Sequence, residues 1–440
     1  MKFYNREQEL AELNRIRELS FSDHSRLTVV TGRRRIGKTS LIMKSVSTTP
    51  TVYFFVGRKS EASLCAEFLP MASRVLDVFV PPEIQTFRSL FQFLMELAVH
   101  KPFNLVVDEF QEFYNINPTV YSDMQNIWDT YRQRSRMNLI VSGSVYSLMQ
   151  KIFQHSKEPL FGRADNILKL APFDLGTLKA IMQDYQTAYN NDDLLALYTF
   201  TGGVPKYVEL FCDNVPLTKE EMLAFMIRDN SPFTEEGKNL LIEEFGKNYA
   251  TYFSILGAIS GGVNTQSQIE AALGSRSIGG QIKRLIEDYN IVVRQRPLLA
   301  KVGSQTVRYE IQDNFLRFWF NYFERHRSLI EIKNFVALRT MVLEDYPTYS
   351  GVMLERYFKQ QYAESFKYRA IGSWWEPKGA QNEIDLLALK IEKNQAVVAE
   401  VKRQRKNIKP DLVAAKAEHL KNKLLPKYDI EMRFLSLEDM

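Results

Sequence analysis

Cysteine is almost absent from this sequence, since Cys65 and Cys212 are the only two thiols in 440 residues. Two thiols cannot build a disulfide framework, and these two lack the spacing of a metal site. The few histidines are scattered along the chain, which argues against a histidine-rich zinc site and against a Ser-His-Asp hydrolase. A reducing cytoplasm is therefore the simplest location to expect for the protein.

Long apolar runs and a strong net charge are also lacking. No apolar stretch reaches the length of about 18 residues that a spanning helix needs, so we expect no membrane segment. Residues 1–10 are charged and contain no apolar signal core. A formal charge of only +5 forces no nucleic-acid binding, so local basic clusters must carry any such interaction.

A phosphate-binding loop is the strongest positive signal. The apolar run 27–30 predicts a buried strand, and residues 40–43 can carry a helix. Between them the chain fits the pattern G-x-x-x-x-G-K-[ST], with Gly32, Arg33, Arg34, Arg35, Ile36, Gly37, Lys38 and Thr39, followed by Ser40. Lys38 would reach the β- and γ-phosphates of ATP or GTP, and the Thr39 hydroxyl would ligate Mg²⁺. The alternative is a Gly-Lys turn without a ligand.

An acidic pair follows the apolar run 104–107, which has the uniform composition of a strand buried on both faces. The end of such a strand would place Asp108 beside the phosphate loop, in the Mg²⁺ shell. Glu109 would then polarise an attacking water.

Two further residues fit nucleotide chemistry. Ser142 ends the apolar run 138–141 and is placed to sense the γ-phosphate, although a Ser-Gly turn would look the same. Arg163 could act as an arginine finger that offsets charge on the phosphates. An isolated arginine is also compatible with a surface or salt-bridge residue.

The apolar runs alternate with helical segments, which predicts an α/β fold with a doubly wound parallel sheet. The expected strands are 27–30, 51–55, 104–107, 138–141 and 167–170, and helices are expected at 87–98 and 121–131. After residue 173 the pattern becomes helical. Asp174 is a candidate cap for a helix 175–186, which together with 192–199 predicts a lid-like bundle.

The ordered set of motifs resembles the archaeal-type ATPases, a group related to the AAA+ and STAND ATPases. The resemblance rests on residues 3–7, 32–39, 108–112, 142–144, 161–163 and 202–205. It implies that the segment around Arg6 lies near the adenine. It also implies that the turn ending at Pro205 lies near the nucleotide and couples it to the lid. Whether the triple arginine touches phosphates, DNA or a neighbouring subunit stays open.

The middle of the chain has winged-helix proportions. Helices are expected at 250–259, 266–273 and 277–288, and wing strands at 291–293 and 306–311. The third helix would present Arg276, Gln281, Lys283 and Arg284, which suits a DNA groove. The alternative is a rigid connector, as winged helices in this ATPase group often are. The aromatic run 313–320 predicts core packing rather than base stacking.

Two expected strands near the C-terminus, 383–389 and 396–402, form a hairpin. Because side chains alternate along a strand, Glu400 and Lys402 share one face, and Asp385 on the adjacent strand can reach it. Asp385 and Glu400 can bind Mg²⁺, while Lys402 can orient a water or neutralise the attacked phosphate.

This set resembles the restriction-endonuclease-like, PD-(D/E)xK nuclease superfamily, over roughly residues 345–425. The resemblance implies that Glu355, on an expected helix 351–358, is the preceding helical acid. No Pro-Asp pair precedes the acid here, which departs from the pattern. Two solvated charges, or an inactive nuclease fold, are the alternatives. The basic run 402–409 either neutralises backbone phosphates or is a solvated face.

Four domains are therefore expected, each named here by its residues. They are a P-loop ATPase core (1–173), a helical lid (174–240), a winged helix (241–325) and an α/β restriction-endonuclease-like domain (326–440). The predicted function is an ATP- and Mg²⁺-dependent ATPase coupled to a nuclease-like domain. The predicted partner is nucleic acid, DNA more than RNA, with no membrane partner and a possible homo-oligomer. The alternative function is an ATP-dependent switch or DNA-binding scaffold.

Overall fold

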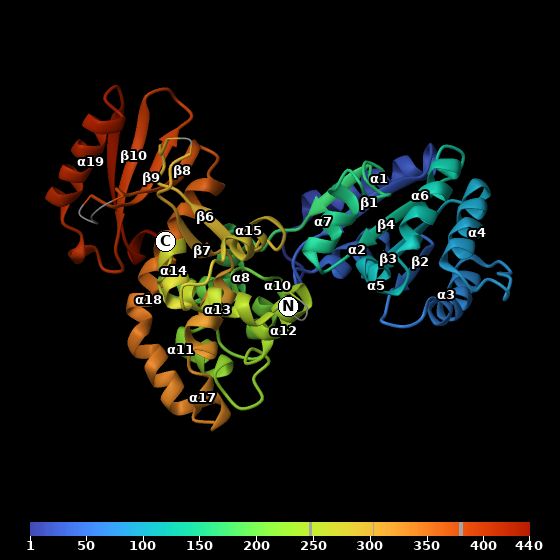
Figure 1. Cartoon of the computed structure of the whole chain (residues 1–440), viewed down its shortest axis with the longest axis horizontal. Coiled ribbons are helices and arrows are strands. Elements are labelled where there is room, and N and C mark those ends of the chain that lie inside the picture. The colour runs from blue at the N-terminus through green and yellow to red at the C-terminus, as the bar shows by residue number, and fades with distance from the viewer. Residues whose placement is uncertain (246–248, 302, 378–381) are drawn as a thin grey trace. The chain divides into compact units, whose positions relative to one another are not determined.

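The computed structural model describes residues 1–245, 249–301, 303–377 and 382–440. The chain divides into two compact units, Lys2–Pro172 and Phe173–Met440, and Met1 belongs to the second. Figure 1 labels many elements of both units, and its colour follows the residue number. Within the described residues, no helix combines the length and the apolar character needed to cross a membrane.

A five-stranded parallel sheet forms the centre of the first unit, in the order β2-β3-β4-β1-β5. Its strands are β1 (Arg26–Thr31), β2 (Thr51–Phe55), β3 (Phe103–Asp108), β4 (Met137–Ser142) and β5 (Asn166–Lys169). These bounds confirm all five predicted strands. Because β1 and β3 flank β4 and run in the same direction, the motifs at their carboxyl ends meet at one edge of the sheet.

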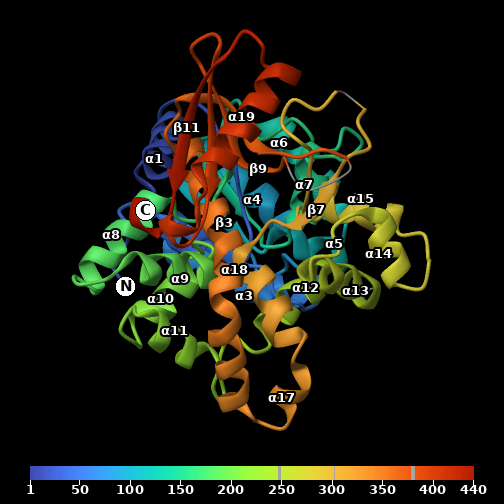
Figure 2. The ribbon, with the colours of Figure 1, turned by 90° about the vertical axis from the view of Figure 1, so that its left-hand side faces the viewer.

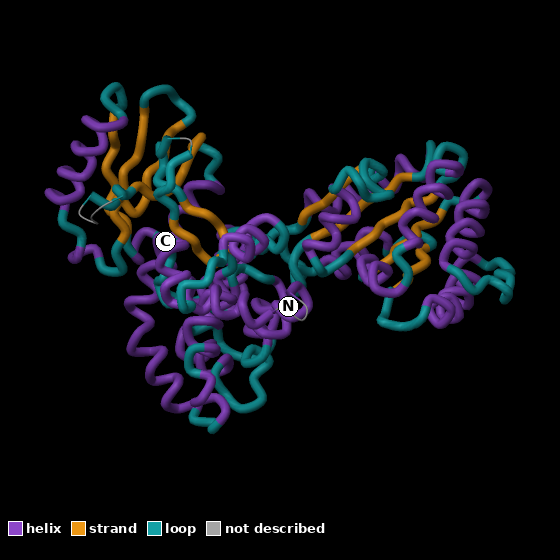
Figure 3. The backbone as a smooth tube through the Cα atoms, in the orientation of Figure 1, coloured by secondary structure: helices purple, strands orange, loops and turns teal. Residues whose placement is uncertain are grey.

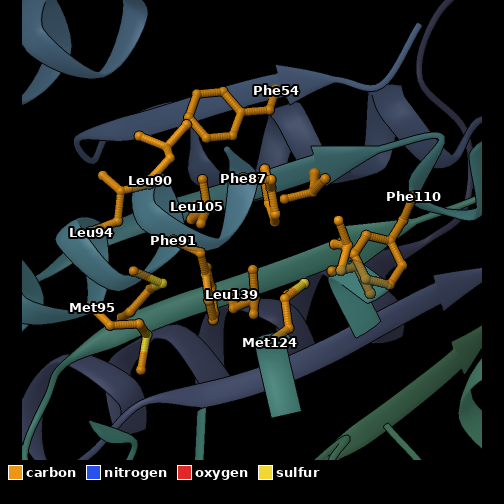
Figure 4. Close-up of a cluster of buried hydrophobic side chains, with 14 of the residues drawn as sticks. Phe54, Phe87, Leu90, Phe91, Leu94, Met95, Leu105, Phe110, Met124 and Leu139 are labelled. Atoms are coloured by element: carbon orange, nitrogen blue, oxygen red, sulfur yellow. The ribbon is translucent and has the colours of Figure 1, made fainter. Parts of the chain in front are cut away.

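Helices cover both faces of this sheet, as Figure 3 shows for the first unit. They are α1 (Glu7–Ser22), α2 (Lys38–Val46), α3 (Glu61–Leu76), α4 (Phe87–His100), α5 (Phe113–Ile116), α6 (Thr119–Tyr131) and α7 (Tyr146–Gln154). Successive residues of β3 pack into two different hydrophobic cores, one on each face of the sheet. Leu105 packs with Phe54 and Phe91 in the larger core (Figure 4), whereas Val106 packs with Leu41 of α2. This two-sided burial is why the strands are apolar throughout.

The second unit begins with a helical bundle. Its helices are α8 (Leu175–Tyr185), α9 (Asn191–Thr201), α10 (Pro205–Cys212), α11 (Lys219–Met226) and α12 (Glu236–Phe245). Asp174 caps α8, because its carboxylate accepts a hydrogen bond from the Thr177 N–H at 2.7 Å. Gly202, at a φ of 57°, ends α9, and Pro205 begins α10. The turn 202–205 is thus a connection between two helices.

Three helices and a two-stranded hairpin follow, as the winged-helix proportions predict. They are α13 (Tyr249–Ser260), α14 (Gln266–Ala272), α15 (Gly279–Glu287), β6 (Val292–Gln295) and β7 (Arg308–Ile311). The hairpin contacts the C-terminal sheet. The Leu298 N–H donates to the Ser373 carbonyl oxygen at 2.8 Å, and Arg308 pairs with Glu383 and lies over the Trp375 ring. The hairpin and its loop are therefore packed against the C-terminal part of the chain.

The aromatic run after β7 is part of the core, as predicted. It comprises α16 (Asn314–Phe318), a π-helical turn (Trp319–Glu324) and then α17 (Arg327–Glu331). Phe315, Phe318 and Trp319 have no exposed surface. The Trp319 indole N–H donates to the Thr234 carbonyl oxygen at 2.9 Å, so its polar end is satisfied as well.

The C-terminal part is a mixed sheet with the order β11-β10-β9-β8, in which only β10 and β11 are parallel. Its elements are α18 (Phe335–Glu364), β8 (Tyr368–Trp374), β9 (Ile384–Lys390), β10 (Gln395–Val401), α19 (Pro410–Leu424) and β11 (Asp429–Leu435). Figure 2 shows α18 as a long helix beside α17. The predicted hairpin is confirmed, but α18 extends well beyond the expected range 351–358. The further division of the second unit into lid, winged helix and C-terminal domain stays a prediction.

Candidate functional site

The loop between β1 and α2 contains two glycines with positive φ values. Gly32 and Gly37 have φ values of 147° and 88°, and a Cβ on Gly32 would lie 2.9 Å from the Leu170 carbonyl oxygen. Lys38 is 7% exposed, and its Nζ donates to the carbonyl oxygens of Gly32 at 3.0 Å and Arg33 at 3.1 Å. The backbone of the loop therefore holds the Lys38 ammonium.

The other predicted loop residues differ in exposure. Ile36 is buried and packs with Leu41 of α2, which anchors the loop to the core. Arg34, Thr39 and Ser40 are exposed, whereas Arg33 and Arg35 are half-buried. A role for any of the three arginines in nucleotide binding stays a prediction.

Asp108 lies at the centre of a hydrogen-bond network at the carboxyl ends of the strands. Its Oδ2 accepts from the Thr39 hydroxyl and from the Tyr53 hydroxyl, both at 2.8 Å, and its Oδ1 accepts from the Ser142 hydroxyl at 2.5 Å. The carboxylate is thus joined to both neighbouring strands and to the phosphate loop. Burial and the charge of Asp108 raise the pKa of Tyr53, so its hydroxyl remains a donor.

Tyr53 was missed by sequence reasoning. Its only signal is a hydroxyl in the otherwise largely apolar strand β2. Ser142 was predicted as a γ-phosphate sensor, and here its hydroxyl is bonded to Asp108. That contact places it beside the acidic pair, while its proposed sensing of phosphate stays a prediction.

Glu109 follows Asp108 in the left-handed conformation, with a φ of 54°. Its Oε2 accepts hydrogen bonds from Gln111 Nε2 at 2.5 Å and from the Ser144 hydroxyl at 2.7 Å. Gln111 and Ser144 therefore hold the carboxylate that the sequence predicts to polarise water. Gln111 and Ser144 both belong to motifs of the predicted resemblance, but their contacts with Glu109 were not predicted.

Three residues with predicted nucleotide roles lie in different settings. Arg6 is 6% exposed and donates to the Ala171 carbonyl oxygen at 2.6 Å, next to the Leu170 carbonyl that faces Gly32. Arg163 pairs with Asp129 at 3.0 Å. Pro205 is the first residue of α10, in the second unit. The roles of these residues toward a nucleotide stay predictions.

A second cluster of charged side chains lies on the C-terminal sheet. The register of β9 and β10 pairs Leu386 with Ala399, so Asp385 and Glu400 lie at the next position along the hairpin. Lys402 Nζ lies 3.2 Å from Asp385 Oδ2 and 3.0 Å from Glu400 Oε1. The structure thus brings together the three residues that the sequence predicts to converge.

The cluster is wider than the sequence predicts. Lys416 of α19 donates to Glu400 Oε2 at 2.8 Å. Burial would raise the pKa of Glu400, but hydrogen bonds from Lys416 and Lys402 hold it below its usual value. Among the described residues, no three His, Cys, Asp or Glu side chains are grouped as a ready metal site. Because each carboxylate oxygen of Glu400 has a lysine partner, a metal bound by Glu400 would have to displace one of them.

Glu355 is the predicted helical acid, and it lies on α18 with 27% of its side chain exposed. Burial of the carboxyl group raises its pKa to about 8, and the charge of Asp385 adds to the shift. Burial also raises the pKa of Asp385, against a hydrogen bond from the Val401 N–H. At neutral pH and without metal, Glu355 therefore keeps its proton.

The raised pKa of Glu355 makes folding stability depend on pH. Between the usual pKa of 4.5 and about 8, the folded chain binds this proton and the unfolded chain does not, so stability falls as pH rises. Glu355→Gln does not titrate. We expect the variant to match the parent at about pH 4, below the usual pKa, and to exceed it by about 1 kcal/mol or more near pH 8.

The measurement is chemical unfolding of both proteins in EDTA at the two pH values. Glu418→Gln is the control, because Glu418 is exposed on α19. A difference between Glu355→Gln and the parent that stays constant with pH would contradict the raised pKa.

The predicted DNA-facing residues lie on or before α15. Arg276, Lys283 and Arg284 are exposed, whereas Gln281 is half-buried. Lys283 also lies 3.7 Å from Glu287 on the same helix. The run 402–409 is not a free tail, because Arg403 pairs with Asp192 at 2.8 Å.

Two family models match the chain. One, described as an ATPase domain predominantly from Archaea, matches residues 3–211. The other, described as archaeal and bacterial proteins of unknown function, matches residues 319–417. An uncharacterized protein of Methanocaldococcus jannaschii is 31% identical over 409 residues, which cover 91% of this chain and 87% of that protein. The chain belongs to the archaeal-type ATPases.

Solved structures can be compared with this archaeal-type ATPase. The Walker-type ATPase PABY2304 of Pyrococcus abyssi has a TM-score of 0.55 at 19% identity, over 72% of this chain and 96% of that chain. The ORC2 protein of Aeropyrum pernix has a TM-score of 0.47 at 14% identity, over 76% of this chain and 95% of that chain. The likeness to the Pyrococcus structure agrees with the predicted α/β P-loop fold.

Proposed function

We propose that this P-loop ATPase binds Mg²⁺-ATP at the β1–α2 loop and hydrolyses it there. Lys38 binds the β- and γ-phosphates, and Thr39 and Asp108 would hold Mg²⁺. The 2.8 Å contact between Thr39 Oγ1 and Asp108 Oδ2 supports this, because hydroxyl and carboxylate oxygens are the ligands that Mg²⁺ prefers. When bound, Mg²⁺ would neutralise charge on the phosphates.

Glu109 polarises the attacking water in this proposal. Its position directly after Asp108 supports the role, as do the two hydrogen bonds that hold its carboxylate. Ser142 senses the γ-phosphate, and Arg163 acts as an arginine finger. An arginine finger supplied by a neighbouring subunit would require a homo-oligomer, and turnover would then depend on protein concentration.

The C-terminal domain is proposed to cleave nucleic acid in a metal-dependent reaction. The approach of Lys402 to both Asp385 and Glu400 carries this proposal, because two carboxylates and a lysine can bind a divalent metal and an attacked phosphate. Asp385 and Glu400 would hold the metal. Glu355, whose pKa responds to the charge of Asp385, would act beside them.

Nucleic acid, DNA more than RNA, is the proposed substrate. The cations Arg276, Lys283 and Arg284 at α15 support this, since all three are exposed. We propose that the nucleotide state of the first unit controls cleavage in the second.

A second candidate function is an ATP-dependent switch or scaffold with an inactive nuclease fold. The pairing of Glu400 with both Lys402 and Lys416 favours it, because both carboxylate oxygens already have cationic partners. The two candidates differ in whether the cluster binds metal and cleaves.

Incubation of the protein with supercoiled plasmid DNA in Mg²⁺ or Mn²⁺ tests the nuclease proposal. We expect the parent to cleave, Asp385→Ala to lose metal binding, and Lys402→Ala to bind metal without cleaving. ATP turnover should survive both changes, since the two clusters belong to different units. Lys406→Ala is a matched control, because Lys406 is exposed and close in sequence.

Absence of both metal binding and cleavage in the parent would reject the nuclease proposal and leave the switch. Cleavage that persists in Lys402→Ala would show that another protein group, or a contaminant, performs the reaction.

A further inference from the structure

Lys416 differs from the other lysines of α19 in its burial. The apolar side of this helix, with Val413, Ala417 and Leu420, packs on the C-terminal sheet. Lys416 precedes Ala417 and is only 17% exposed, whereas Lys421 is exposed. A half-buried ammonium is costly unless it is paired, and its partner here is Glu400 at 2.8 Å.

Glu400 therefore has one lysine on each carboxylate oxygen. Oε1 faces Lys402 at 3.0 Å and Oε2 faces Lys416 at 2.8 Å, while Lys402 also reaches Asp385 at 3.2 Å. The negative charges of the two carboxylates are thus paired with the positive charges of two lysines. A divalent metal bound by Asp385 and Glu400 would displace at least one ammonium from Glu400.

The two lysines are not equivalent in this exchange. Lys402 can keep Asp385 Oδ2 as a partner while a metal binds Glu400 and the other carboxylate oxygen of Asp385. Lys416 has Glu400 as its one ion-pair partner among the described residues. Once released, its ammonium needs a new anion at the same place, and a phosphate of a bound nucleic acid supplies one.

We infer that Lys416 binds a backbone phosphate of the nucleic acid held at the Asp385–Glu400–Lys402 cluster. The inference rests on the proposed nuclease function for the position of the substrate. Lys416 is thus a substrate-binding residue contributed by α19, outside the hairpin that carries the other members of the cluster. Its present pairing with Glu400 keeps the ammonium in place until metal and substrate arrive.

The test compares Lys416→Ala, Lys416→Arg and the control Lys421→Ala. Binding of a fluorescein-labelled DNA duplex is followed by anisotropy in EDTA and in Ca²⁺ over a range of salt concentrations. In Ca²⁺, loss of one phosphate contact should reduce the slope of log K against log salt by about 0.9 in Lys416→Ala. In EDTA, where Lys416 stays paired with Glu400, the slope should not change. Lys416→Arg should restore the slope, and Lys421→Ala should leave it unchanged.

Metal binding and cleavage are measured on the same proteins. We expect Lys416→Ala to bind Mn²⁺ at least as tightly as the parent, because a competing cation is gone, and to cleave at least about 10-fold more slowly, as loss of a charged hydrogen bond predicts. A Lys416→Ala variant that matches Lys421→Ala in salt slope and in cleavage would overturn the inference.

Failure of the nuclease function would look different. A parent that binds DNA but neither binds Mn²⁺ nor cleaves rejects that function. A lowered salt slope in Lys416→Ala of a protein that binds no metal would instead contradict the exchange, because Lys416 would then contact phosphate without being released from Glu400. A parent that binds no DNA would overturn both. Thermal melting of each variant checks that the domain is still folded. We expect it to be, because Glu400 keeps Lys402 as a partner when Lys416 is replaced.

Discussion

Glu109→Gln is expected to leave ATP bound while turnover falls by on the order of 10²-fold or more, as loss of a water-activating group predicts. Glutamine has the same shape as glutamate, so the left-handed backbone at this position is no more strained than before. It can still contact Gln111 and Ser144, but it cannot accept a proton from water. In this variant the affinity for ATP should therefore stay unchanged while the rate of hydrolysis falls.

Calorimetry with ATP and single-turnover hydrolysis measure the two quantities. Glu83→Gln is a matched control, because Glu83 is exposed in the loop before α4. Normal turnover in Glu109→Gln would make Glu109 structural and require another base. Loss of ATP binding would instead place Glu109 among the binding residues.

Lys38→Ala should remove most of the affinity for ATP. Lys38 is 7% exposed and its ammonium is held by two loop carbonyls, so it is in place before the nucleotide arrives. Removal of a charged hydrogen-bond donor costs about 1.5–3 kcal/mol, which corresponds to a loss of roughly 10- to 150-fold. Calorimetric titration with Mg²⁺-ATP measures this loss.

Lys44→Ala is the control for that experiment. Lys44 lies on the same helix α2, is exposed, and stacks on the Phe3 ring instead of entering the loop. If Lys38→Ala bound ATP as tightly as Lys44→Ala does, the β1–α2 loop would not be the nucleotide site.

The first unit was largely predictable from sequence because its strands are buried on both faces. Leu105 and Val107 face one core and Val106 the other, which leaves a continuous apolar run that ends in Asp108. A local pattern is then enough to find the strand, its end and the acid. The parallel sheet brings that end beside the phosphate loop.

The C-terminal domain was less predictable. Pro347 lacks an N–H and normally ends a helix, yet here it lies inside α18, between the buried Tyr346 and Tyr349. Tertiary packing thus overrides the local signal. The strands β8 and β11 and the helix α19 carry weaker patterns, because few of their residues are fully buried.

The residues missed at both clusters share one cause. Tyr53 reaches Asp108 across 55 positions of sequence, and Lys416 reaches Glu400 across 16. Neither contact follows from a motif, since each depends on which elements pack together. Asp385, Glu400 and Lys402 were found because alternation along a hairpin is a local rule.

The central claim is that the nucleotide state of the first unit controls cleavage by the second. The most direct measurement is the rate of plasmid cleavage in Mn²⁺ with and without ATP, for the parent and for Lys38→Ala. We predict that ATP changes the rate several-fold in the parent and leaves it unchanged in Lys38→Ala. Equal parent rates with and without ATP, or no cleavage under either condition, would contradict the claim.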